Sequence, residues 1–255
     1  MIYLPTLYIA ELFDRAPDKG CDGMTLDALS ELLDLLEAAE VQSPSAPSLI
    51  GANILNKTGT PSVLMMLGDC HLPSVSAWIN SLNPKGLSSI VACSFAQIEG
   101  ASDLTTTDAS ILIGHGVSLA SRGLSGRPLV GMPLAELRAE LTESQQKLSE
   151  VAGYQVGILA PTVSTFGQAV DGLVLEEARR AGYRLILEPG GRVTELSSDA
   201  TPITPERLDY RIVSTHDSPK SLADWVIGTG LSRQRAHIRE LLQRPRRILS
   251  RLKST

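Results

Sequence analysis

Two patterns of apolar and polar positions alternate along most of this chain. Short, unbroken apolar runs that end in glycine, proline or polar residues predict strands buried on both faces. Longer segments with leucine or valine at every third or fourth position predict amphipathic helices. The predicted strands are Val63–Leu67, Ser88–Phe95, Ser110–Gly114, Gln155–Leu159, Tyr183–Leu187 and Leu208–Val213. The predicted helices are Met24–Glu40, Ser74–Leu82, Pro133–Val151, Phe166–Ala181 and, as one or two segments, Leu222–Leu249.

The order of these elements predicts the fold class. Strand and helix alternate, which is typical of βα units joined into a parallel sheet or barrel. A length of 255 residues suits a single α/β barrel domain. Met1–Ala10 predicts an edge strand or an entry segment, and Ser118–Val130, which is rich in Gly, Ser and Arg, predicts a loop. We therefore expect one α/β domain over residues 1–230, built on a parallel sheet or barrel, and a basic helical tail over residues 231–255.

Polar residues directly follow the predicted strand Val63–Leu67. They are Asp69 and His71, which come after the turn residue Gly68 and are separated by Cys70. Functional groups of α/β proteins gather at the carboxyl ends of parallel strands. Asp69 and His71 would share a face if the strand continued, because side chains alternate along a strand. This strand end is the predicted functional site, although glycine and aspartate also simply end strands.

Charge narrows the classes of partner. The net charge of −5 disfavours nucleic acid as the main partner. Residues 233–255 differ from the rest, with eight Lys or Arg residues against one acidic residue, Glu240. This tail is either a solvated helix face or a docking surface for an anionic partner, such as an acidic polysaccharide, membrane headgroups or an acidic protein.

The cysteines, the first residues and the lengths of the apolar runs bear on the cellular location of the protein. The three cysteines have no metal-binding spacing, and an odd, small number of them suits a reducing environment. The first residues lack the pattern of a signal peptide. The chain also lacks an apolar run of about 18 residues, so we expect no transmembrane segment and a cytoplasmic location.

The order and spacing of segments over roughly residues 20–230 resemble the polysaccharide deacetylases with the NodB-homology domain, carbohydrate esterase family four. Met65-Met66-Leu67-Gly68-Asp69-Cys70 occupies the place of the family's Leu-Thr-Phe-Asp-Asp-Gly. Leu112-Ile113-Gly114-His115-Gly116-Val117-Ser118-Leu119 is set against Ile-Gly-Ser-His-Gly-x-Ser-His. Leu134-Ala135-Glu136-Leu137 resembles the start of the family's Leu-rich helix, and Leu159-Ala160-Pro161-Thr162 its proline-containing loop. The resemblance implies a distorted (β/α)7 barrel.

The resemblance carries over only part of the family's metal site. Gly68 stands where the family has its general base, whereas Asp69 matches a metal-binding aspartate. The first of two metal-binding histidines matches His115, and the second is Leu119. A catalytic zinc usually needs three protein ligands, and His71 would supply the third only by rearrangement.

The orienting arginine and the substrate loop also depart from the family pattern. Leu159 or Ala160 stands in the place of the arginine, and neither can pair with a carboxylate. Pro161 and Thr162 are the candidate substrate-binding residues. Loss of a general base alone removes a contribution of roughly 10²- to 10⁴-fold to the rate.

Two hypotheses follow from the resemblance. The preferred one is a catalytically degenerate deacetylase-like protein of carbohydrate or exopolysaccharide metabolism, which binds a glycan or a partner protein and needs no cofactor. The alternative is an active zinc hydrolase that removes acetyl groups from N- or O-acetylated sugars with an unusual site built from Asp69, His71 and His115.

Overall fold

The computed structural model describes residues 2–15, 22–44, 61–68, 72–99, 105–164, 167–190, 194–196 and 206–228. Asp69, His71 and the basic tail of residues 231–255 lie outside these ranges. The predicted helix Leu222–Leu249 is described only in its first part, which belongs to a helix over residues 219–228.

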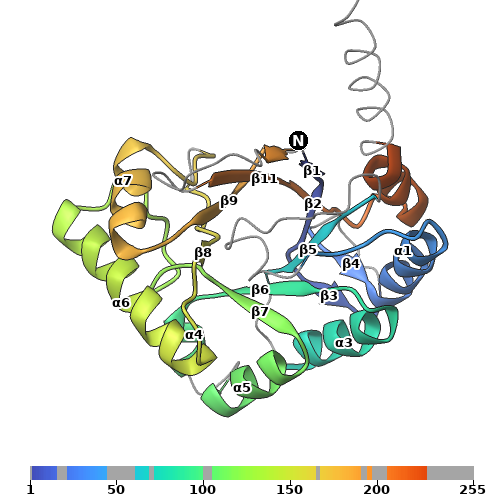
Figure 1. The fold of residues 1–255 in the computed structure, drawn as a ribbon, viewed down its shortest axis with the longest axis horizontal. Helices are drawn as coiled ribbons and strands as arrows, with labels where there is room; N and C mark the ends of the chain where they lie inside the picture. The colour runs from blue at the N-terminus through green and yellow to red at the C-terminus, as the bar shows by residue number, and fades with distance from the viewer. Residues whose placement is uncertain are drawn as a thin grey trace, which may run out of the picture.

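Seven parallel strands close into a barrel (Figure 1). Around the ring their order is β11-β2-β5-β6-β7-β8-β9, and each strand is parallel to both neighbours. The strands are β2 (Thr6–Ile9), β5 (Leu64–Leu67), β6 (Ser89–Cys93), β7 (Val117–Ser121), β8 (Ile158–Leu159), β9 (Leu185–Pro189) and β11 (Glu206–Ile212). The predicted (β/α)7 barrel is confirmed. The segment expected to form an edge contains β2, which instead lies within the closed ring between β11 and β5.

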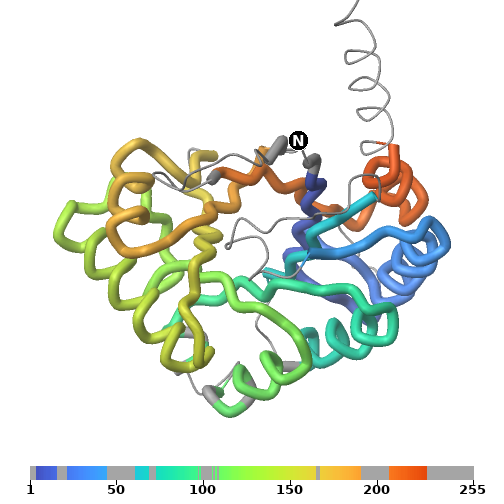
Figure 2. Tube along the Cα trace, viewed as in Figure 1, coloured from blue at the N-terminus to red at the C-terminus, as the bar shows by residue number. Residues whose placement is uncertain are grey.

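Helices surround the barrel on its outside (Figure 2). They are α1 (Leu26–Ala38), α3 (Leu72–Leu82), α4 (Phe95–Glu99), α5 (Thr106–Gly114), α6 (Leu134–Ala152), α7 (Gly172–Ala181) and the helix over residues 219–228, with a 3-10 turn η1 (Asn83–Lys85) after α3. Two further strand pairs are β1 (Ile2–Leu4) with β10 (Thr194–Leu196), and β3 (Leu12–Phe13) with β4 (Met24–Thr25). Within the described residues no helix is both long and apolar enough to cross a membrane.

Capping residues account for where the predicted helices begin and end. The side chain of Thr25 accepts a hydrogen bond from the backbone N–H of Ala28 at 3.2 Å, so α1 begins at Leu26. Asp171 caps α7 in the same way, which places its start at Gly172, six residues later than predicted. Gly153 follows α6 with a φ of +71°, the left-handed conformation in which glycine ends helices.

Residues 110–114 were predicted as a strand, and this prediction is wrong. They form the last five residues of α5. A short apolar run fits either a buried strand or one face of a helix, so its sequence alone does not decide between them. In the structure Ala109 and Leu112 pack into the core, whereas Ile111 is 53% exposed, as one face of a helix requires.

The fourth barrel strand along the chain is β7, whose last four residues lie in the segment predicted as a loop. All five of its residues are buried. Val117 and Leu119 point to the helix layer, and Ala120 points into the barrel. Small residues fit here because the barrel interior is narrow and is filled by neighbouring strands. Ser and Ala weaken the apolar pattern, which explains why the sequence predicted a loop.

Candidate functional site

Side chains alternate between the two faces of each strand, and this alternation decides which of them line the opening at the carboxyl end of the barrel, which we call the mouth. Leu64 and Met66 of β5, Ile90 and Ala92 of β6, Ala120 of β7, and Ile158 and Ala160 at β8 all pack in the barrel interior. Because side chains alternate, the next inward positions are Gly68, Ser94, Arg122 and Thr162. Tyr8 of β2 and Tyr210 of β11 also pack against this interior cluster. We call Tyr8, Gly68, Ser94, Arg122, Thr162 and Tyr210 the mouth residues.

Arg122 connects three strand ends across the mouth. Its Nη1 donates a hydrogen bond to the carbonyl oxygen of Gly68 at 3.2 Å, and its Nη2 donates to Thr162 Oγ1 at 3.2 Å. Thr162 in turn donates from Oγ1 to the carbonyl oxygen of Gly126 at 2.7 Å. These bonds place a half-buried guanidinium between the ends of β5, β7 and β8.

The side chain of Tyr8 fills the space beside Gly68. A Cβ atom built on Gly68 would lie 2.0 Å from the hydroxyl oxygen of Tyr8 and 2.5 Å from its Cζ. Such distances are far shorter than van der Waals contact, so no larger residue fits unless Tyr8 moves. Gly68 is therefore a position where the tertiary packing requires the absence of a side chain.

The two tyrosines of the mouth are in contact with each other. Their ring centroids lie 4.9 Å apart with the planes tilted by 44°. Burial raises the pKa of Tyr210 above its ordinary value of 10.0, Tyr8 and Glu188 act in the same direction, and the charge of Arg122 partly opposes them. The Tyr210 hydroxyl therefore stays protonated near neutral pH and can donate a hydrogen bond.

A buried polar network holds the loop that carries Arg122. Ser121 donates from Oγ to Ser144 Oγ of α6 at 3.2 Å and accepts from the backbone N–H of Gly123 at 3.0 Å. The hydroxyls of Ser144 and Tyr183 are 2.9 Å apart. Glu140 of α6 is buried and accepts from the backbone N–H of Ser125 at 2.9 Å. The loop is thus fixed on both sides of Arg122 by groups on the helix layer.

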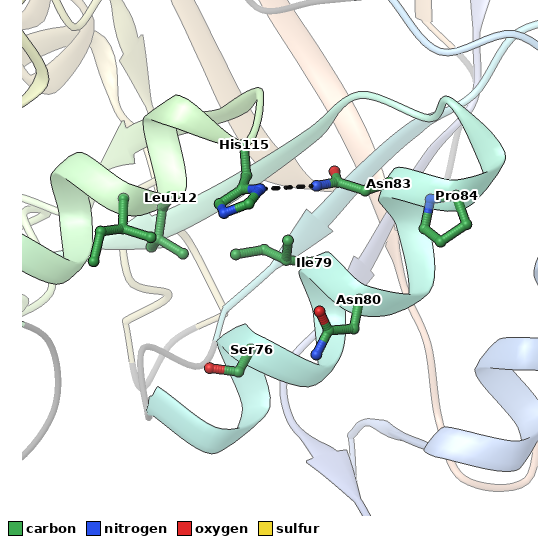
Figure 3. A pocket seen from close by; sticks show the side chains of 8 residues that line it. Ser76, Ile79, Asn80, Asn83, Pro84, Leu112 and His115 are labelled. Carbon is green, nitrogen blue, oxygen red and sulfur yellow. Dashed lines mark hydrogen bonds between the residues drawn. The ribbon is translucent and has the colours of Figure 1, made fainter.

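His115 does not lie at this mouth. It follows α5 and precedes the first residue of β7, so it lies at the amino end of the barrel, opposite Gly68 at the end of β5. Figure 3 shows His115 facing Asn83 across a surface pocket between α3 and α5, with 3.4 Å between His115 Nδ1 and Asn83 Nδ2. Ile79, Leu112 and Pro84 also line this pocket.

One of the three predicted metal ligands, His115, thus lies away from the mouth of the barrel. The interpretation of His115 as a residue at a strand's carboxyl end is wrong, because residues 110–114 form a helix. Asp69 and His71 lie outside the described residues, so their role as ligands stays a prediction. Pro161 and Thr162, the predicted substrate-binding residues, do lie at the mouth's end of the barrel, immediately after β8.

Because the barrel strand is β7 and not residues 110–114, the family's histidine-containing pattern aligns with different residues of this chain. In the pattern Ile-Gly-Ser-His-Gly-x-Ser-His a strand leads directly into the first histidine. The strand that does so here is β7, so the pattern falls on Leu119-Ala120-Ser121-Arg122-Gly123-Leu124-Ser125-Gly126. Ser121, Gly123 and Ser125 match it, whereas Arg122 and Gly126 stand at the two histidine positions. The sequence did not reveal Arg122, because the pattern aligned with residues 112–119, seven residues before the segment 119–126.

The described mouth residues do not fit a metal ion. Zinc is bound by cysteine, histidine and carboxylate side chains, and the described polar groups here are two phenols, two hydroxyls and a guanidinium. Across the described ranges, no three His, Cys, Asp or Glu side chains lie close enough to hold a metal together. Gly126 has a φ of +76°, and its built Cβ would lie 3.1 Å from Ser94 Oγ, so a histidine there would be strained.

Removing the guanidinium of Arg122 is expected to destabilise the protein. Arg122→Leu leaves the carbonyl oxygen of Gly68 and the hydroxyl of Thr162 without this donor, which costs about 1–2 kcal/mol of the free energy of unfolding. Urea unfolding measures the loss. Arg179→Leu, on the exposed face of α7, is the control and should change stability by less than about 0.5 kcal/mol. Equal effects of the two variants would contradict a structural role for Arg122.

Comparison with known proteins adds evidence from structure rather than from sequence. No family model matches the sequence, and no curated protein is similar to it. Deacetylase PplD of Streptococcus pyogenes, solved in complex with acetate, gives a TM-score of 0.72 at 14% identity over 87% of this chain and 96% of its own. IcaB from Ammonifex degensii gives 0.70 at 16% identity, over 88% and 97% of the two chains.

A polysaccharide deacetylase from Bacillus cereus gives a TM-score of 0.70 at 15% identity, over 88% of this chain and 69% of its own. At these identities the likeness concerns the path of the backbone. It agrees with the strand order, the closed barrel and the resemblance of the sequence pattern. The protein therefore adopts the (β/α)7 barrel fold of the polysaccharide deacetylases.

Proposed function

We propose that this protein is a deacetylase-like barrel that binds carbohydrate at its mouth without metal-dependent hydrolysis. Its place would be in a polysaccharide pathway, as a glycan-binding protein or as a partner of the enzymes that act on the polymer. The structural neighbours IcaB and the deacetylase domain of BpsB from Bordetella bronchiseptica share the fold, which supports the proposed place in a polysaccharide pathway.

The observation that carries the proposal is the arginine at the mouth. Arg122 occupies the first histidine position of the corrected pattern and binds the backbone carbonyl of Gly68, which occupies the position of the general base. A guanidinium repels a divalent cation and has no lone pair with which to bind one. Tyr8 closes the space that an aspartate at position 68 would need. At the position of the base, Tyr8 leaves no space for an aspartate side chain. At the position of the first metal-binding histidine, Arg122 repels a metal ion.

The mouth nevertheless keeps groups that suit sugar binding. Tyr8 is half-buried and offers a ring face for the C–H groups of a pyranose, and Thr162 and Arg122 offer hydrogen-bonding groups. Binding sites for small polar ligands combine an apolar wall with a few convergent polar groups in this way. The arrangement supports recognition of a sugar, and it supplies no proton acceptor for hydrolysis among the described mouth residues.

Metal content and acetate release test the proposal together. Purified protein incubated with equimolar zinc and then desalted should hold far less than one zinc per chain. It should release no acetate from acetylated chito-oligosaccharide above the buffer rate. Stoichiometric zinc, with acetate release that disappears in Asp69→Ala, would establish the alternative of an active hydrolase.

Sugar binding itself is measured by saturation-transfer NMR with a panel of oligosaccharides. Transfer to at least one oligosaccharide is expected, and it should weaken in Tyr8→Ala, which removes the half-buried ring at the mouth. The matched control is Tyr154→Ala, since Tyr154 contacts the backbone N–H of Leu119 from the helix layer rather than from the interior. Absence of transfer to the whole panel would contradict glycan binding.

A further inference from the structure

We propose that the mouth selects sugars that carry a carboxylate, and that Arg122 is the residue that binds this group. The inference rests on the proposed function, because it concerns the ligand of the same site. It adds the chemical class of that ligand, an acidic glycan such as a uronic-acid polymer. The barrel itself would then recognise an acidic glycan.

The first observation concerns the partners of Arg122. Both of its hydrogen bonds go to neutral oxygens, a backbone carbonyl and a hydroxyl. Several other arginines in the described structure pair with carboxylates. These are Arg127, Arg138, Arg180, Arg207 and Arg211, whose partners are Glu136, Glu177, Glu176, Glu188 and Asp217 respectively. Arg122 therefore carries a positive charge that no described carboxylate neutralises by direct contact.

The second observation concerns the setting of that charge. Arg122 is half-buried and its chain position directs it to the barrel interior, where electrostatic interactions are stronger than in water. A partly buried charge without a counter-ion is unfavourable, and a bound anion relieves the cost. A guanidinium has five N–H groups, of which the two bonds use two, so the others can take a carboxylate.

The third observation concerns the neighbours that would complete the site. The protonated hydroxyl of Tyr210 lies close enough to Arg122 for the charge of Arg122 to affect its pKa. The contact of Tyr210 with Tyr8 places two aromatic rings beside the same charge. Tyr210 is buried, so a sugar ring would lie on the half-buried Tyr8, and its carboxylate substituent would then reach the guanidinium. Neutral sugars would use the same wall but would leave the charge of Arg122 uncompensated.

The experiment compares two ligands with the same sugar chain, whose carboxyl groups are either charged or neutralised as methyl esters. Trigalacturonate and its fully methyl-esterified form are titrated into the protein by isothermal calorimetry at low ionic strength. The acid is expected to bind at least about tenfold more tightly than the ester, since hydrogen bonds to charged groups are worth more than neutral ones. Added salt should weaken binding of the acid more than binding of the ester.

Variants assign the preference to Arg122. Arg122→Gln should bind the two ligands equally, and Arg122→Lys should keep part of the preference because it keeps the charge. Arg127→Gln is the control in the same loop and should keep the full preference, because Arg127 is paired with Glu136. Circular dichroism of each variant shows whether it is folded, and the Lys variant gives a readout if the Gln variant is not.

The possible outcomes separate this inference from the proposed function. Equal binding of acid and ester by the wild-type protein would overturn the inference and leave glycan binding intact. A preference for the acid that appears only in Asp69→Asn would also overturn it, because Asp69 would then be an internal counter-ion. Binding of neither form, together with no transfer to any sugar in the NMR panel, would overturn both.

Discussion

Replacing Gly68 with alanine is expected to lower the free energy of unfolding by about 3 kcal/mol. The added Cβ would lie 2.0 Å from the hydroxyl oxygen of Tyr8, so the ring of Tyr8 must leave its place against the barrel interior. Equilibrium unfolding in urea measures the loss. Gly68→Asp, which restores the carboxylate of the family pattern, should also destabilise the protein, because its side chain meets the same ring.

Two further variants show whether Tyr8 causes this loss. Gly114→Ala is the matched control, since a Cβ on Gly114 meets nothing within 4 Å, and it should change stability by less than about 1 kcal/mol. In a Tyr8→Ala background the Gly68→Ala change should cost about 2 kcal/mol less than in the wild type. Equal costs of Gly68→Ala in both backgrounds would show that Tyr8 does not close this position.

High pH is expected to weaken the protein through Tyr183. Burial raises the pKa of Tyr183 from 10.0 to about 12, and hydrogen bonds with Ser121 and Ser144 oppose the shift. The unfolded chain loses this proton near pH 10, whereas the folded protein keeps it until near pH 12. The unfolded state therefore binds fewer protons in this window, and stability falls by about 2–3 kcal/mol as the pH rises from 10 to 12.

The Tyr183→Phe variant isolates this effect. It should be less stable than the wild type by about 1 kcal/mol near pH 8, since the hydroxyl contact with Ser144 is lost. Between pH 10 and 12 the wild type should lose stability more steeply, so that the two curves converge and then cross. Urea unfolding at a series of pH values gives both curves. Parallel curves over the whole range would exclude Tyr183 as the titrating group.

Stability of this network matters for the mouth because Tyr183 and Arg122 are connected. Tyr183 contacts Ser144, Ser144 contacts Ser121, and Ser121 directly precedes Arg122. A change that loosens the network should therefore shift the guanidinium relative to the ends of β5 and β8. In the sugar-binding experiments, Tyr183→Phe should weaken binding modestly without removing the preference for an acidic sugar.

Local chemistry in the sequence was enough to predict the architecture. Leucines at helical spacing, the cap Thr25 and the terminating Gly153 define α1 and α6, because capping and amphipathic packing act within a few residues, whereas the start of α7 was predicted six residues too early. Apolar runs and their alternation with helices predict a parallel sheet or barrel, since strands covered on both faces need such runs, and the resemblance to the deacetylases implied the barrel. The absence of a side chain at position 68 was also visible in the sequence, although its cause was not.

Packing decided the remaining elements and the site. Residues 110–114 and 117–121 are both short and only partly apolar, and contacts with the rest of the molecule determine which becomes helix and which becomes strand. Arg122 meets Gly68 and Thr162 across 54 and 40 positions of the chain, a contact that no local pattern records. Likewise, Tyr8 reaches Gly68 only because β2 and β5 are neighbours in the closed barrel. The sequence by itself thus determined the barrel, whereas only the tertiary structure placed an arginine and a tyrosine at the mouth, because closing the ring brings distant strand ends together.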